Sequence, residues 1–360
     1  MSRVLVLLTV VACMAMAVAA EGQRWTVVDG EVVFKGSDLP HCNIDPQQVT
    51  VGGLSAGAFQ AVQMAVAHSG LFAGLGVVAG GPFYCAQNQL DLALTSCTKT
   101  PALISDTVLL GEMTYMETTL QIDPLKNIEE TNVYLYSGTL DTVVHQGVMS
   151  KLEEQLSKWV DASAMTVKLD IPSVHSIVTD YTGHACDHFE SPYIVNCGYD
   201  LAGEMLTSLY GPLNNRSAPT APPASSILDN VYQFSQAAFI PGVYTPGELS
   251  LDTTAYAYVP PACIASDDDA MNATFCKLLV LFHGCEQSLK EISTQFVLNT
   301  GVLQWAETNN IAVLFPQATS NALNPKSCFD WWGYTGVEYP TKLGPQIATV
   351  YSMMQHMAKL

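Results

Sequence analysis

The chain has 360 residues, and 49% of them are hydrophobic, which is enough for one large core or two smaller ones. Acidic residues outnumber basic residues by 33 to 14, and the sequence contains no basic run. This balance argues against nucleic acid and membrane surfaces as partners, so we interpret the acidic excess as a solubility feature.

Residues 1–20 have the pattern of a secretory signal peptide. Arg3 provides the positive start, "VLVLLTVVACMAMAV" the apolar core, and small residues up to Ala19 or Ala20 the cleavage site. A membrane anchor is the alternative, but the apolar run is shorter than the roughly 18 residues that a spanning helix needs. We therefore expect a secreted, extracellular protein whose mature chain begins near residue 21.

The rest of the chain alternates between predicted strands and helices. The first pair is a strand at 49–54, "VTVGGL", followed by a helix at 56–68. Residues 211–226, "GPLNNRSAPTAPPASS", are rich in Pro, Ser and Ala and are interpreted as a loop or linker. The remaining predicted strands are 74–81, 132–138, 165–171, 254–260, 277–284 and 311–317, and the helices are 149–160, 199–211, 301–309 and 344–360. This alternation predicts a single α/β domain over 21–360 with a mostly parallel sheet.

The first strand runs into Gly53-Leu54-Ser55-Ala56-Gly57, which matches the GxSxG pattern of a nucleophile elbow. A strand before the motif and a helix after it are what the elbow requires, because they expose the serine oxygen at the N-terminus of the helix. Ser55 is therefore the candidate nucleophile. The alternative is a tight strand–helix turn with an idle serine.

A serine nucleophile needs a base, usually a histidine held by a carboxylate, in the chain order Ser, Asp, His for elbow enzymes. Asp141 follows the predicted strand 132–138 at its C-terminal end, where a catalytic acid would lie in an open α/β sheet. The alternative is a turn aspartate that caps the following helix.

Four histidines compete for the role of base, and we favour His175 because it follows the predicted strand 165–171. His145 is four residues from Asp141 and would share its loop. His184 and His188 flank Cys186 in what looks like a disulfide-bound loop. These three side chains could instead bind zinc, but alternating His and Cys in a secreted chain favour a disulfide, so we expect no metal.

The segment "KLLVLFHGCEQS", residues 277–288, is a strand followed by His283-Gly284-Cys285. This is the form of an oxyanion-hole loop, which normally precedes the elbow. Its late position predicts a circular permutation. In that case 277–284 pairs with 49–54, the helix 344–360 ends near Cys42, and the loop 211–226 joins the former termini.

Together these segments are similar to the secreted poly(3-hydroxybutyrate) depolymerases, most closely the circularly permuted, single-domain fungal type. The matching pieces are "GLSAGAFQAVQMAVAHSGLFAGLGVVAGGPFYCAQ", "SGTLDTVV", "HSIVTDYTGHACD", "PYIVNCGYDLAGEMLTSLYGPLN", "LFHGCEQS" and "SCFDWWGY", and they touch most of residues 42–340. Residues 21–40 are not covered.

The resemblance implies a circularly permuted α/β-hydrolase fold with Ser55 as nucleophile, Asp141 as orienting acid and His175 as base. It places the oxyanion hole at the N–H groups of Ala56 and Cys285. It also implies that Trp331, Trp332 and Tyr334 line a cleft for the polyester, with core packing as the alternative for the tryptophans.

The expected function is hydrolysis of polyester bonds through an acyl-enzyme, with no cofactor, by a protein that we expect to be a monomer. One alternative is a secreted carboxylesterase acting on soluble esters or on feruloyl or acetyl esters of plant polysaccharides. Another is an inactive hydrolase fold used for binding, which the presence of all three triad residues disfavours.

Nine of the ten cysteines remain after the signal peptide, which contains Cys13. Such a density suits an oxidising compartment. We expect the pairs Cys85–Cys97, Cys186–Cys197 and Cys263–Cys276, and also Cys285–Cys328, which would join the oxyanion loop to the aromatic run. Cys42 is left over. Two sequons, at Asn215 and Asn272, are compatible with glycosylation.

Overall fold

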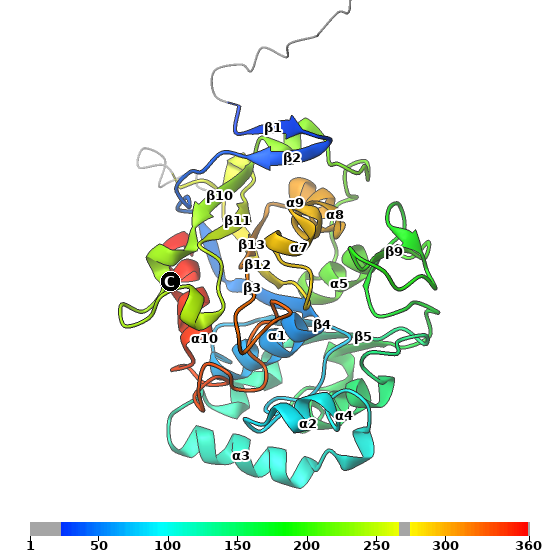
Figure 1. The fold of residues 1–360 in the computed structure, drawn as a ribbon, viewed down its shortest axis with the longest axis vertical. Coiled ribbons are helices and arrows are strands. Elements are labelled where there is room, and N and C mark those ends of the chain that lie inside the picture. Colours follow the sequence, from blue (N-terminus) through cyan, green and yellow to red (C-terminus); the bar gives the residue numbers. More distant parts are fainter. Residues whose placement is uncertain (1–22, 266–273, 359–360) are drawn as a thin grey trace, which may run out of the picture.

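A central sheet of eight strands forms the middle layer of the computed structural model, which describes residues 23–265 and 274–358 (Figure 1). In spatial order the strands are β10 (Val231–Ser235), β11 (Thr254–Tyr258), β13 (Ile311–Phe315), β12 (Cys276–Phe282), β3 (Ile44–Leu54), β4 (Gly74–Val78), β5 (Asn132–Tyr136) and β6 (Met165–Lys168). Only β11 runs against the others, because it pairs antiparallel with both β10 and β13. The expected α/β fold with a mostly parallel sheet is confirmed.

Helices cover both faces of this sheet (Figure 1). Those packed on one face are α1 (Ala56–Ala67), α3 (Asp106–Thr118), α4 (Gln146–Leu156) and α10 (Pro345–Ala358). Those on the other face are α5 (Leu201–Tyr210), α6 (Ser225–Leu228), α7 (Leu289–Ile292), α8 (Gln295–Asn299) and α9 (Val302–Asn309). The short helix α2 (Leu90–Leu94) lies below α1 in Figure 1.

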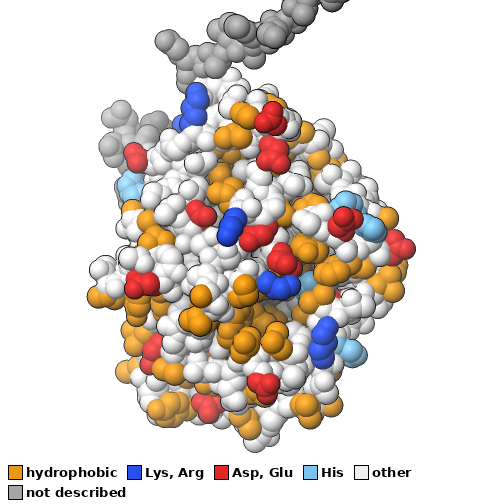
Figure 2. Space-filling model, viewed as in Figure 1, with side chains coloured by type: hydrophobic (Ala, Val, Ile, Leu, Met, Phe, Trp, Pro, Cys, Tyr) orange, Lys and Arg blue, Asp and Glu red, His pale blue; other side chains and the backbone are white. Residues whose placement is uncertain are grey.

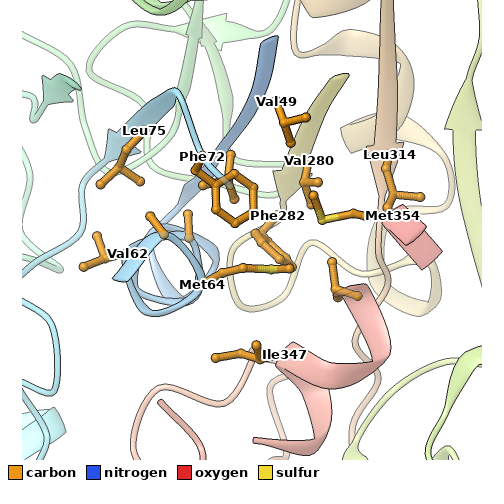
Figure 3. Close-up of a cluster of buried hydrophobic side chains, with 14 of the residues drawn as sticks. Val49, Val62, Met64, Phe72, Leu75, Val280, Phe282, Leu314, Ile347 and Met354 are labelled. Carbon is orange, nitrogen blue, oxygen red and sulfur yellow. The ribbon is translucent and has the colours of Figure 1, made fainter. Parts of the chain in front are cut away.

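The hydrophobic run of β12 explains its central position. Leu278, Val280 and Phe282 point to one face of the sheet and Leu279 and Leu281 to the other, as the period of a strand requires. Figure 3 shows the first face, where Val280 and Phe282 meet side chains of α1 and α10. Both faces of the strand are therefore buried in apolar side chains.

Two small sheets lie outside the central one. The hairpin of β1 (Trp25–Val28) and β2 (Glu31–Phe34) lies beside β10, in the segment for which the sequence makes no structural prediction. A three-stranded sheet joins β7 (Ile177–Thr179), β9 (Ile194–Asn196) and β8 (His184–Ala185). Both small sheets, β10, α2, α3, α7 and α8 were not predicted from the sequence, and the loop predicted at 211–226 already ends where α6 begins at Ser225.

The end of α10 lies beside the segment that leads into β3. The N–H of Cys42 donates to the carbonyl of Met357 at 2.6 Å, and His356 Nε2 donates to the carbonyl of Leu39 at 2.9 Å. The strand β12 pairs in parallel with β3, with Leu279 opposite Thr50. The expected neighbours are therefore confirmed, whereas the permutation itself stays a prediction. Leu360, Asn272 and the proposed signal peptide lie outside the described residues.

Four disulfides join the expected cysteines, namely Cys85–Cys97, Cys186–Cys197, Cys263–Cys276 and Cys285–Cys328. Cys42 is a free, buried thiol, and burial raises its pKa to about 12. None of the helices described is both long and apolar enough to cross a membrane.

Candidate active site

Ser55 lies at the junction of β3 and α1 in a strained backbone conformation, with φ 57° and ψ −122°. Its N–H donates to the carbonyl of Val78 on the neighbouring strand at 2.9 Å, and its own carbonyl accepts from the N–H groups of Ala58 and Phe59 at 2.9 and 3.0 Å. The chain therefore reverses from strand to helix within one residue, as predicted for an elbow. The following N–H, that of Ala56, is the first of the helix and has no partner within it.

The start of α1 packs directly on the turn after β12. A side chain on Gly57 would bring its Cβ within 2.4 Å of the carbonyl oxygen of His283, so only glycine allows this approach. On the other side, a Cβ on Gly284 would lie 3.4 Å from the Cβ of Ser55. The His283-Gly284-Cys285 turn, more than 200 residues away in sequence, is thus beside the serine.

Asp141 and His175 meet through a hydrogen bond of 2.7 Å between Asp141 Oδ2 and His175 Nδ1. The other carboxylate oxygen, Oδ1, accepts from the N–H groups of Val143 and Val144, both at 2.8 Å. The side chain of Asp141 is fully buried and that of His175 is 8% exposed. Asp141 therefore binds a local turn but does not cap the following helix, whose N-cap is His145, and its second oxygen is left for His175.

The loops that carry these two residues are joined to each other. The N–H of Thr139 donates to the carbonyl of Ile171 at 2.9 Å, and that of Leu140 donates to the carbonyl of Ser173 at 3.1 Å. The hydroxyl groups of Tyr136 and Ser173 are 2.7 Å apart. Because both loops leave the carboxyl ends of neighbouring parallel strands, β5 and β6, these bonds set the distance between acid and base.

The other three histidines that competed for the role of base make different contacts. His145 precedes α4, and its Nδ1 accepts from the N–H of Gly147 at 2.9 Å. His184 Nε2 bonds the carbonyl of Ser191 at 2.9 Å, and His188 pairs with Glu190 at 2.7 Å. Cys186 is in a disulfide, so it is not a thiolate ligand, and no cluster of three metal-ligating side chains occurs within 23–265 and 274–358.

Ser55 and His175 line one cavity of about 490 Å³, together with Gly284 and Cys285. Hydrophobic side chains form most of its wall, and Figure 2 shows such side chains gathered around a hollow on this face. The apolar lining residues are Leu54, Phe59, Leu90, Leu94, Val143, Val144, Phe189, Tyr193, Leu323, Pro325, Trp331 and Trp332. The charged lining residues are Glu286 and Lys326, which pair with each other at 3.2 Å.

The structure brings Trp331 and Trp332 to this cavity but not Tyr334. Trp331 stacks on Phe59 with ring centroids 4.3 Å apart, so it is both a wall of the cavity and a packed core residue. The hydroxyl of Tyr334 turns away, donating to the carbonyl of Cys328 at 2.8 Å and accepting from Gln346 at 2.8 Å. Within the aromatic run, the two tryptophans therefore line the cavity, whereas the hydroxyl of Tyr334 bonds groups behind it.

The buried side chain of Asp330 binds the backbone of the aromatic run that contains Trp332 and Tyr334. Its buried carboxylate accepts from the N–H groups of residues 332–335 at distances between 2.7 and 3.3 Å. Burial raises the pKa of Asp330 despite these bonds. Asp330 and Gln287 lie within the sequence motifs, but the motifs do not indicate their roles, and no motif marks Phe189, Leu90 and Leu94.

Several known proteins are similar to this chain over most of its length, although no family model matches it. A poly(3-hydroxybutyrate) depolymerase from Delftia acidovorans is 42% identical over 341 residues, covering 94% of this chain but only 65% of that protein. A polyhydroxybutyrate depolymerase from Talaromyces funiculosus is 35% identical over 350 residues, covering 92% of this chain and 96% of that protein.

Two solved structures are similar as well. The crystal structure of PHB depolymerase from Penicillium funiculosum superposes with a TM-score of 0.77 at 32% identity, covering 90% of this chain and 99% of that one. A PHB depolymerase complexed with an R3HB trimer superposes with a TM-score of 0.77 at 33% identity and the same coverage.

Proposed function

Because the chain belongs to the poly(3-hydroxybutyrate) depolymerase family, we propose that it is a secreted serine esterase that hydrolyses polyesters of the poly(3-hydroxybutyrate) type. The observation that carries the proposal is the Asp141–His175 hydrogen bond at the wall of a cavity that Ser55 also lines. A relative of known structure holds an R3HB trimer, which supports the same substrate class here.

In this proposal Ser55, His175 and Asp141 act as nucleophile, base and orienting acid. Asp141 holds His175 through Nδ1, which leaves Nε2 to take the proton of Ser55 as it attacks the ester carbonyl. The N–H groups of Ala56 and Cys285 stabilise the tetrahedral oxyanion. His175 then returns the proton to the departing alkoxide, and water repeats the two steps on the acyl-enzyme. No metal or organic cofactor takes part.

The walls of the cavity suit an uncharged chain. A poly(3-hydroxybutyrate) segment has no charge and presents methyl groups and ester carbonyls, so burying it against Trp331, Trp332 and Phe189 costs no desolvation of ions. The two charged lining residues, Glu286 and Lys326, form an ion pair with each other, so neither presents an unpaired charge to the substrate. We propose that Trp331 and Trp332 contact the polyester, whereas Tyr334 supports them from below.

Secretion through residues 1–20 and a monomeric state belong to the same proposal. The four disulfides require an oxidising compartment, and Asn215 lies in an exposed position where a sequon could be modified on the secretory route. The N-terminus and mass of the protein recovered from a culture medium would check these points.

The test uses suspended poly(3-hydroxybutyrate) particles, with the wild-type protein beside Ser55→Ala. We expect the wild type to release soluble 3-hydroxybutyrate products and the variant to lower turnover by roughly 10⁴ to 10⁶, because the covalent route is lost. Thermal unfolding of both proteins controls for folding. A Ser55→Ala variant with more than about a tenth of wild-type activity would contradict the assignment of the nucleophile.

The same samples separate the alternatives. Cleavage of soluble or feruloyl and acetyl esters without attack on the particles would favour the carboxylesterase. A folded wild-type protein inactive on every ester would favour the binding protein.

A further inference from the structure

Two buried side chains hold the turn that carries Cys285, and the hydrolytic steps above give neither of them a role. His283 is 0% exposed and Gln287 is 1% exposed. They flank Gly284 in the sequence and bond it in the structure. What they hold in place is the peptide between Gly284 and Cys285.

The partners of His283 determine which of its ring nitrogens carries the proton. The N–H of Ala318 donates to Nε2 at 3.0 Å, so Nε2 must offer a lone pair. The proton is therefore on Nδ1, which donates to the carbonyl oxygen of Gly284 at 2.7 Å. Complete burial lowers the pKa of His283 to about 4, so the ring is neutral near pH 7 and keeps this arrangement.

This bond also orients the N–H of Cys285, because both groups belong to one peptide plane. In a trans peptide the C=O and the N–H point in opposite directions. With the Gly284 carbonyl turned to His283, the Cys285 N–H turns away from it. Within the described residues that N–H has no hydrogen-bond acceptor, and the turn lies beside Ser55 at the cavity wall.

Gln287 holds the opposite side of Gly284. Its Oε1 accepts from the N–H of Gly284 at 2.9 Å. Its Nε2 donates to the carbonyl groups of Pro192 and Tyr193 at 2.9 and 3.3 Å. Gly284 is thus bonded on both of its peptide groups, and the turn is joined to the loop that carries Tyr193.

We propose that His283 is a positioning residue for ester hydrolysis: its Nδ1–H fixes the Gly284–Cys285 peptide so that the Cys285 N–H is preorganised to donate to the oxyanion, with Gln287 holding the other side of Gly284. The proposal rests on the proposed function and deepens it. Since a donor fixed in advance needs no reorganisation during the reaction, loss of the fixing bond lowers kcat more than it changes KM.

The experiment compares His283→Asn with His283→Gln on a soluble p-nitrophenyl butyrate substrate. The amide nitrogen of asparagine lies near the position of Nδ1, so it can still donate to Gly284, whereas glutamine reaches the position of Nε2 and loses that donor. We expect His283→Gln to lower kcat by roughly 10- to 100-fold with KM changed less than about threefold, and His283→Asn to keep kcat within about threefold of the wild type. Active sites are counted by complete phosphonylation of Ser55, so kcat refers to folded enzyme.

If His283→Gln does not fold, Gln287→Met replaces it, because methionine keeps the size of glutamine and removes the acceptor for the Gly284 N–H. The same loss of kcat at nearly constant KM is expected. Equal losses in the asparagine and glutamine variants, or unchanged kcat in the glutamine variant, would overturn the role of His283, and unchanged kcat in Gln287→Met would overturn that of Gln287, while the proposed function stands. A wild type inactive on this ester, on the particles and on the other esters tested would overturn the proposed function itself, and this inference with it.

Discussion

At the scale of single residues, the two carboxylate oxygens of Asp141 have different partners, the backbone of a turn and the ring of His175. The bonds from Val143 and Val144 to Oδ1 fix the plane of the carboxylate, and Oδ2 is then in place for His175. The imidazole proton is therefore held on Nδ1 in the resting site. The local turn and the contact with His175 therefore depend on the same side chain, whereas the cap of the following helix is His145.

Asp141→Asn tests this division of tasks. The amide oxygen of asparagine can still accept from Val143 and Val144, but its NH₂ group would then face His175 Nδ1 and favour the wrong tautomer. We expect a folded protein whose kcat is lower by about 10⁴ on soluble ester. His184→Ala is the control with near-wild-type kcat, because His184 bonds the carbonyl of Ser191, packs against the ring of His188 and does not line the cavity. A loss smaller than about tenfold in Asp141→Asn would remove Asp141 from the mechanism.

At the scale of elements, the disulfide Cys285–Cys328 joins the turn after β12 to the loop before α10. It closes a span of 43 residues with Cα atoms 4.2 Å apart. On one side of it lies the N–H proposed for the oxyanion hole, and on the other lie Asp330 and the two cavity tryptophans. One covalent bond thus joins the proposed oxyanion hole to the cavity wall that we propose contacts the polyester.

Replacing both Cys285 and Cys328 by alanine keeps the Cys285 backbone N–H and removes the link. We expect the free energy of unfolding to fall by about 4 kcal/mol in the chain-entropy model, and kcat to fall because the turn is less fixed. Denaturant unfolding and ester kinetics measure the two effects. The matched control is the alanine pair at Cys263 and Cys276, a span of 13 residues outside the cavity, which should lose about 3 kcal/mol and keep kcat. Equal kcat in both double variants would contradict a role of the link in the site.

At the scale of the whole molecule, two buried histidines make stability depend on pH. Burial lowers the pKa of His68 to about 4; the charge of Asp123 acts in the opposite direction, and that of Lys342 lowers this pKa further. Burial also lowers the pKa of His283 to about 4. In the unfolded chain both histidines have a pKa near 6.5, so below this pH the unfolded chain binds protons that the folded protein does not bind. The stabilisation is complete above pH 6.5 and is lost as the pH falls toward 4, by at most about 1.4 kcal/mol per pH unit for each group.

His68→Phe isolates one of these groups. The ring of His68 stacks on Tyr351 at 4.3 Å, and its Nε2 is buried without a partner in the described part of the chain, so phenylalanine keeps the packing and removes the titration. Between pH 6.5 and 4.5 we expect the variant to lose stability less steeply than the wild type, by about one proton, as measured by urea unfolding at several pH values. Parallel slopes would show that His68 is protonated equally in both states.

The amino-acid sequence alone predicted the features that depend on neighbours in the chain. The elbow at Ser55, the strands that lead to Asp141 and His175, and the hydrophobic runs of β12 and β13 all follow from local patterns of size and polarity. The three disulfides of short span were predictable for the same reason. The fourth, Cys285–Cys328, and the parallel pairing of β12 with β3 join segments far apart in the chain, which no local pattern relates. The strand pairing was predicted from the late position of the oxyanion-hole segment, and the disulfide from a link expected between that loop and the aromatic run.

The tertiary structure decided what each polar side chain does. Sequence patterns could not show that Tyr334 turns its hydroxyl toward Gln346 rather than the cavity, or that His145 accepts from Gly147, because a hydrogen bond depends on the placement of a partner. The same holds for His283, whose tautomer is determined by Ala318 on the next strand's loop, 35 residues away. Strand periodicity reports which face a residue occupies, whereas the direction of a donor depends on the groups that other segments bring to it.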